Sequence, residues 1–139
     1  MQTKLNPYMG FNGNTKEAME FYQMIFGGKL TMSTFKDGGM PSEGAEGDKI
    51  MHAMIVTDAG LTLMASDTPP GMPYNPGNNI SISLSGYNEQ ELRGYWDKLS
   101  PSATIVMPLE KAPWGDIFGM LTDKFGIQWM VNVVVGQHS

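Results

Sequence analysis

The chain has 139 residues, a net charge of −5 and no cysteine. The acidic balance, with no Lys/Arg cluster, argues against nucleic acid or an anionic membrane as a partner. The lack of cysteine excludes disulfides, thiolate catalysis and Cys-based metal sites. No apolar run approaches the roughly 20 residues of a membrane span, and no signal-peptide pattern is present. We therefore expect a cytoplasmic protein with one domain or two small halves that share a core.

The first half of the chain predicts a strand, a helix and three further strands. Asn14 or Thr15 can cap the helix, with Glu17 placed as in a capping box. Apolar residues at helical spacing continue the helix as far as Gly27-Gly28. The strands are expected over residues 8–11, 29–35, 50–57 and 61–66, with a glycine-rich acidic loop at 37–48 and a turn at 58–60.

A proline-rich segment separates this half from the next. Residues 68–78 hold four prolines, which cannot donate backbone hydrogen bonds, so the segment is expected to be a linker. The same order of elements then restarts. Strands are expected over 80–84, 103–107, 118–122 and 127–135, with a helix that begins after Asn88 and ends at Ser100-Pro101.

The restart indicates an internal repeat. Both halves place a capping pattern before the helix and a tight turn before the last strand. The matching segments are Asn14–Glu17 with Asn88–Glu91 and Asp58–Gly60 with Asp123–Gly126. Two unrelated α+β pieces are the alternative explanation.

Paired modules of this kind resemble the vicinal oxygen chelate (glyoxalase/bleomycin-resistance/dioxygenase) superfamily. Within it, the sequence is similar to the PhnB-like (demethylubiquinone methyltransferase-like) subfamily. The segments that carry the resemblance are Pro7-Tyr-Met-Gly-Phe11, Ala18-Met-Glu-Phe-Tyr22, His52-Ala53, Ser66-Asp67, Trp114-Gly115 and Asp123-Lys-Phe-Gly-Ile-Gln-Trp129. They cover nearly the whole chain, and the last of them is the most specific.

The resemblance implies an α+β fold in which two βαβββ modules form a cupped, mostly antiparallel sheet with helices outside. A single glyoxalase-like domain would then span residues 1–139. Module 1 would cover about residues 1–67, the linker about 68–78 and module 2 about 79–135. The resemblance also implies a homodimer and a ligand site in the concave face.

Strand alternation predicts the side chains that face such a cup. It is cleanest in the fifth strand, where Ile80, Ile82 and Leu84 are expected to be core and alternate with polar residues. Burying unpaired polar groups is costly, so they would line a concavity filled by solvent or ligand; a wet sheet surface without a ligand is the alternative. Together with the resemblance, this predicts a small organic ligand bound by Tyr8, Met64, Asp67, Asn79, Ser81, Trp114, Gln128 and Met130.

Metal-using members of the superfamily place one ligand, usually His or Glu, on each of the first, fourth, fifth and eighth strands. The corresponding positions here fall at Asn6, Met64, Asn79 and Met130. Neutral amides and thioethers are poor ligands for a divalent ion, and the chain has only two histidines. We therefore predict no metal and no cofactor.

Several candidates have two interpretations each. His52 is a candidate acid or base, or a packing or hydrogen-bonding histidine. Asp67 would hydrogen-bond a ligand or His52, or cap the linker. Trp114 would stack on a ligand, or cover a core edge or dimer interface. Asp123 is expected to be a turn residue and Trp129 a core residue.

Binding or sequestering a ligand is the favoured function. One alternative is a metal-dependent lyase or dioxygenase-type enzyme that recruits a metal through carboxylates outside the predicted cup. Another is a methyltransferase-like enzyme acting on a quinone-type substrate, although the chain lacks the glycine-rich turn of a nucleotide-binding sheet. A purely structural dimer module is a further alternative.

Overall fold

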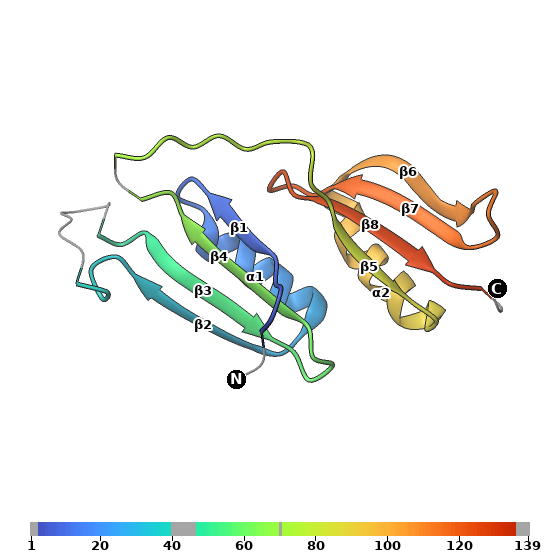
Figure 1. Ribbon diagram of the computed structural model, residues 1–139, viewed down its shortest axis with the longest axis horizontal. Helices are drawn as coiled ribbons and strands as arrows, with labels where there is room; N and C mark the ends of the chain where they lie inside the picture. The colour runs from blue at the N-terminus through green and yellow to red at the C-terminus, as the bar shows by residue number, and fades with distance from the viewer. Residues whose placement is uncertain (1–2, 40–46, 70, 136–139) are drawn as a thin grey trace. The chain divides into compact units, whose positions relative to one another are not determined.

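The computed structural model describes residues 3–39, 47–69 and 71–135. The chain divides into two compact units, Met1–Pro76 and Gly77–Ser139. Each unit has one four-stranded mixed sheet and one α-helix that packs on it (Figure 1). Among the described residues, none of the helices has the length and apolar character needed to cross a membrane. The glycine-rich loop expected at 37–48 lies largely outside the described residues.

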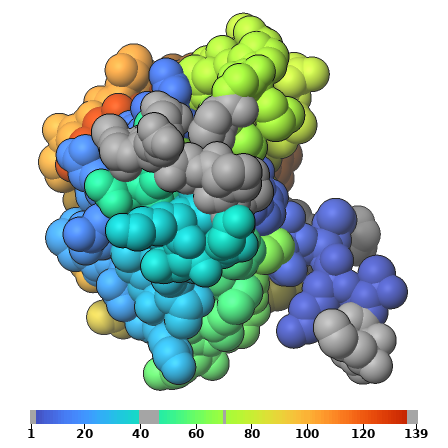
Figure 2. Space-filling model, turned by 90° about the vertical axis from the view of Figure 1, so that its left-hand side faces the viewer, coloured from blue at the N-terminus to red at the C-terminus, as the bar shows by residue number. Residues whose placement is uncertain are grey.

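Unit 1 contains the first helix and the first four strands. Its elements are β1 (Tyr8–Phe11), α1 (Thr15–Phe26), β2 (Lys29–Thr34), β3 (Ile50–Val56) and β4 (Thr62–Asp67). The strand order is β1-β4-β3-β2, with β1 parallel to β4 and the other pairs antiparallel. β2 is therefore an edge strand, and it lies at the surface shown in Figure 2.

Unit 2 repeats this topology. Its elements are β5 (Ile82–Gly86), α2 (Glu89–Leu99), a short 3-10 turn (Ser100–Ser102), β6 (Thr104–Lys111), β7 (Ile117–Thr122) and β8 (Gln128–Val133). The strand order is β5-β8-β7-β6, again with one parallel pair, β5 with β8. The predicted α+β fold, with strand, helix and three strands in each half, is confirmed.

Each helix buries one stripe of side chains against one face of its own sheet. In α1 the buried positions include Ala18, Tyr22 and Ile25, and in α2 they include Trp96 and Leu99. The opposite face of each sheet has no helix of its own unit on it (Figure 1).

The backbone of β7 approaches α2 closely at a glycine. A Cβ on Gly119 would lie 2.8 Å from Cη2 of Trp96 and 2.9 Å from Cα of Leu109. A side chain at this position would therefore push the indole away from the sheet. The missing Cβ lets the largest side chain of α2 pack directly on the strand.

Strand alternation agrees with the sequence in β4 and β8. Leu63 and Ala65 are buried while Met64 between them is half-buried, and Trp129 and Val131 enclose Met130 in the same way. The expected core role of Ile80 is wrong. This side chain is 80% exposed, because β5 begins pairing with β8 only at the following apolar position, Ile82.

The N-terminus of α1 is closed by a residue from a distant strand. Asn14 occupies the N-cap position but makes no side-chain cap bond. Instead, Oδ1 of Asp67, at the end of β4, accepts hydrogen bonds from Gly13 N, Thr15 N and Thr15 Oγ1 at 2.9, 3.1 and 2.7 Å. Its Oδ2 accepts from Ile50 N at 2.8 Å. One buried carboxylate thus joins β4 to the start of α1 and to β3.

The second helix has the cap that the sequence predicts. The side chain of Asn88 accepts a hydrogen bond from the backbone N–H of Glu91 at 3.0 Å. The two modules therefore cap equivalent helices differently. A local side chain does so in unit 2 and a long-range carboxylate in unit 1.

Replacing Asp67 by Ala is expected to lower the free energy of unfolding by about 3 kcal/mol or more, because four donors in or near the core lose a charged acceptor. The matched control is Asp58→Ala, in the exposed turn after β3, which should change it by less than about 0.5 kcal/mol. Urea denaturation followed by far-UV circular dichroism measures both. Equal losses in the two variants would contradict this role for Asp67.

Candidate functional site

The open face of the unit 1 sheet gathers four of its larger side chains. Tyr8 on β1 lies opposite Met64 on β4, and Met64 lies opposite Met54 on β3. His52 precedes Met54 by two residues, so both point to the same face. The buried Ala53 between them points toward α1, which places all four on the side away from the helix.

Two of these side chains contact each other. The hydroxyl of Tyr8 lies 3.2 Å from Nδ1 of His52, and the ring centroids are 5.8 Å apart. In a neutral imidazole one ring nitrogen donates and the other accepts. Nδ1 therefore either accepts from the hydroxyl or donates to it, and Nε2 is the nitrogen that this pair leaves available.

The open face of unit 2 carries a row of thioethers. Met130 on β8 lies between Ser83 on β5 and Met120 on β7, and Met120 lies opposite Met107 on β6. At the beginning of β8, the hydroxyl of Ser81 donates to Oε1 of Gln128 at 3.2 Å. The structure therefore brings together three of the predicted ligand-binding residues of this half, Ser81, Gln128 and Met130.

Trp114 extends this face at one end. It lies in the turn between β6 and β7, where the N–H of Ala112 donates to the carbonyl of Asp116 at 2.7 Å. The indole is 54% exposed and makes an edge contact with Phe118, at a centroid separation of 5.3 Å. Phe118 lies opposite Asn132 on the open face, so Trp114 adds aromatic surface to it.

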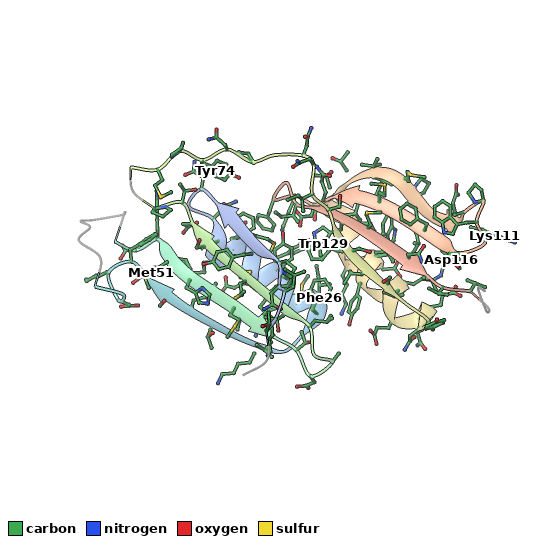
Figure 3. All side chains as sticks on the ribbon, in the orientation of Figure 1. Phe26, Met51, Tyr74, Lys111, Asp116 and Trp129 are labelled. Carbon is green, nitrogen blue, oxygen red and sulfur yellow. The ribbon has the colours of Figure 1, made fainter. Side chains whose placement is uncertain are left out.

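Asp116 is a site residue that the sequence did not reveal. It is buried, its Oδ2 accepts from Nδ2 of Asn132 at 3.0 Å, and its Oδ1 accepts from Val135 N at 3.3 Å. It directly precedes β7, in the turn from β6, and lies near Lys111 (Figure 3). The only available signal was an acidic residue directly before an apolar strand. Asp116 fixes the amide of Asn132 on the open face.

Two predicted ligand-binding residues lie apart from these groups. Asp67 shares the helix-covered face with Leu63 and Ala65, and its carboxylate is occupied by backbone and hydroxyl donors. We therefore assign it a structural role in place of the predicted contact with a ligand or His52. Asn79 is exposed and precedes β5, so strand pairing does not hold it on the open face.

The donor set does not fit a divalent metal ion. Among residues 3–39, 47–69 and 71–135, no three His, Cys, Asp or Glu side chains form a group that would hold one. The strand pairs at which the resemblance places ligands bring Tyr8 beside Met64 and Ser83 beside Met130. Phenol, hydroxyl and thioether groups supply no negative charge at neutral pH to offset a divalent ion.

The turn between β7 and β8 sets the register of the unit 2 face. Oδ1 of Asp123 accepts from Phe125 N at 2.8 Å and Ile127 N at 3.0 Å, while its Oδ2 accepts from the Trp129 indole N–H at 2.8 Å. Gly126 adopts a φ of 89°, which favours glycine. The expected turn role of Asp123 is confirmed by these bonds. The expected core role of Trp129, which is labelled in Figure 3, is confirmed by its burial.

Unit 1 makes the equivalent turn with a neutral side chain. The hydroxyl of Thr57 accepts from Leu61 N at 3.0 Å, and the backbone bonds between the two residues match those of Asp123 and Ile127. The residue that corresponds to Asp123 is thus Thr57, one position before the predicted Asp58. The two turns share the same backbone hydrogen bonds, but a hydroxyl accepts the side-chain bond in unit 1 and a carboxylate does so in unit 2.

Asp123→Ala should destabilise the protein by about 2–3 kcal/mol, because a buried indole N–H and two turn N–H groups lose their charged acceptor. Trp129 reports on the change directly, so its fluorescence emission in urea titrations is the measurement. Asp97→Ala, on the exposed side of α2, is the control and should stay within about 0.5 kcal/mol of the parent. An Asp123 variant as stable as this control would contradict the account.

The sequence and fold match known proteins over almost their whole length. The family model described as Glyoxalase/Bleomycin resistance protein/Dioxygenase superfamily matches residues 4–131. Protein YjdN from Escherichia coli is 32% identical, over 96% of this chain and 97% of that protein.

Two solved structures also match. Protein PA1353 from Pseudomonas aeruginosa is 38% identical, with a TM-score of 0.81 over 95% of this chain and 98% of its own. The PhnB protein from Bacillus cereus is 25% identical, with a TM-score of 0.73 over 95% of this chain and 100% of its own. The chain belongs to the glyoxalase/bleomycin-resistance/dioxygenase superfamily and, within it, to the PhnB-like subfamily.

Proposed function

We propose that the protein binds a small organic ligand through the open faces of its sheets, without a divalent metal ion, and acts as a homodimer. The observation that carries the proposal is the Tyr8–His52 pair beside Met54 and Met64, on a face that α1 does not cover. A polar pair next to an apolar surface is the usual composition of a small-molecule site.

The chemistry of this face favours a ligand with one polar end. The Tyr8 hydroxyl and the His52 imidazole both donate and accept hydrogen bonds, and so orient a carbonyl or hydroxyl group. The thioethers of Met54 and Met64 are flexible and polarisable. They would let the face accept apolar bodies of more than one shape.

Unit 2 offers a second set of groups for the same purpose. Met130 supplies apolar surface, the Ser81–Gln128 pair supplies hydrogen bonds, and Trp114 supplies an exposed aromatic ring. In our proposal these residues form a ligand-binding face on unit 2 by itself. The concave shape of the site rests on the superfamily resemblance.

Binding is favoured over the catalytic alternatives by the chemistry of the site. The lyase and dioxygenase chemistries of the superfamily use a divalent ion, for which the residues at the expected positions are poor ligands. A methyltransferase needs a site for the methyl donor, and the turns that lead from β1 into α1 and from β5 into α2 lack the glycine-rich sequence of a nucleotide-binding sheet.

A thermal-shift screen of small aromatic and carbonyl compounds is expected to give hits, because a ligand that binds only the folded state raises the melting temperature. For a hit, Met64→Ala and Tyr8→Phe should each raise Kd about tenfold, which corresponds to about 1.4 kcal/mol. Met24→Ala, at an exposed position on α1, is the control. An unchanged Kd in both site variants would contradict the site.

Native mass spectrometry of protein purified without chelator tests the remaining parts of the proposal. The expected species has twice the mass of the 15.3 kDa chain and carries no stoichiometric zinc, manganese, iron or nickel. A near-stoichiometric divalent ion that is lost in His52→Ala would overturn the metal-free proposal. A monomer at micromolar concentration would overturn the homodimer.

A further inference from the structure

Soft donor atoms gather on the open face of unit 1. Met54 and Met64 are direct cross-strand partners, a relation that places Cβ atoms about 4.5–5.5 Å apart. His52 lies two residues before Met54 on the same strand and face, about 7 Å away along β3. All three side chains are only partly buried. One imidazole and two thioethers therefore stand within reach of a common point above the sheet.

A hydrogen bond at its Nδ1 also orients the His52 imidazole. Nδ1 of His52 contacts the Tyr8 hydroxyl at 3.2 Å, and Tyr8 itself lies opposite Met64 on β1. When the second nitrogen of a metal-binding histidine has a hydrogen-bond partner, the partner fixes the tautomer and orients the ring. With Nδ1–H donating to Tyr8, the lone pair of Nε2 is free to bind a cation.

We propose that Nε2 of His52 and the Sδ atoms of Met54 and Met64 form a binding site for a soft monovalent cation, Cu(I) or Ag(I). Thioether and imidazole ligands select soft ions and supply no charge, which suits a monovalent ion better than a divalent one. The site uses β3 and β4 of one sheet. Of the positions where superfamily members carry divalent ions it shares only Met64, and it adds His52 and Met54 from β3. It uses the same side chains as the proposed organic-ligand face, but it is tested with Ag(I) alone, so the two proposals can fail separately.

Unit 2 provides an internal comparison. Met120 and Met130 repeat the Met54–Met64 pair on the equivalent strands, but Phe118 replaces the imidazole two residues before Met120. Ser83 stands beside Met130 where Tyr8 stands beside Met64. The second pair, with Met107 opposite Met120, therefore offers thioethers alone and lacks the stronger, oriented nitrogen ligand. We therefore expect the first equivalent of cation to bind at the unit 1 site.

Titration of the full chain with Ag(I), in buffer without chloride or thiols, tests the site. Protein labelled with ¹³C at the methionine ε-methyl groups resolves which methionines bind. The first equivalent should shift the methyl signals of Met54 and Met64 and leave those of Met24 and Met72, both exposed elsewhere, unchanged. Uniform shifts across all methionines, or a first shift at Met107, Met120 or Met130, would overturn the proposal.

Variants give the second readout. Met54→Leu/Met64→Leu conserves volume and should weaken Ag(I), measured by competition with a chromophoric chelator, by at least about 100-fold, taking about tenfold for each lost ligand. Met120→Leu/Met130→Leu is the matched control and should leave the first affinity unchanged. Circular dichroism confirms that both variants fold. Equal affinities in the two double variants would overturn the proposal.

Tyr8 acts in this site as a positioning residue. Tyr8→Phe should weaken Ag(I) about 10- to 100-fold, the usual effect of removing a second-shell partner, while the methyl shifts of Met54 and Met64 persist at saturation. His52→Ala should weaken binding further and leave Tyr8→Phe without additional effect. An additive loss in the double variant would show that Tyr8 does not act through His52.

Discussion

A single helix covers only one face of a four-stranded sheet, and this constraint shapes both units. Side chains of a strand alternate between faces, so each strand that contributes Leu, Val or Trp to the helix side also contributes to an uncovered side. In β4 and β8 the uncovered positions are Met64 and Met130 with polar neighbours. Polar groups would be costly to bury there unpaired, and on an open face they remain available to a ligand. The fold thus creates the candidate site by leaving one face of each sheet without a helix of its own unit.

Buried carboxylates hold these faces in register. In unit 1, Asp67 joins β4, β3 and the start of α1 through four hydrogen bonds. In unit 2, Asp123 fixes the β7–β8 turn and Asp116 fixes Asn132. Functional side chains on anchored strands keep their geometry better than side chains on loops. The division of roles is consistent: acidic residues of the described core serve the scaffold, and neutral residues occupy the open faces.

The sequence predicts the local features well and the long-range ones poorly. Alternation in β4 and β8, the Asn88 cap and the Asp123 turn depend on residues close in sequence, and all were predictable. The contacts of Asp67 with Gly13 and of Tyr8 with His52 depend on strands far apart in the chain, whose register a single sequence does not fix. Ile80 extends the apolar alternation of β5 two residues before the point where pairing begins, so the sequence alone places it in the core. The internal repeat was enough to predict the strand and helix order. The side chains that meet at the candidate site depend on cross-strand register, which the sequence alone does not fix.

The claim that the face of the unit 1 sheet opposite α1 is the binding surface is tested most directly by a crystal structure of the protein with a ligand selected by thermal shift. The account predicts electron density for the ligand within hydrogen-bond distance of Tyr8 or His52 and in contact with Met54 and Met64. A ligand bound on the α1 side of the sheet, or on the segment between β4 and β5, with this face left empty, would contradict it.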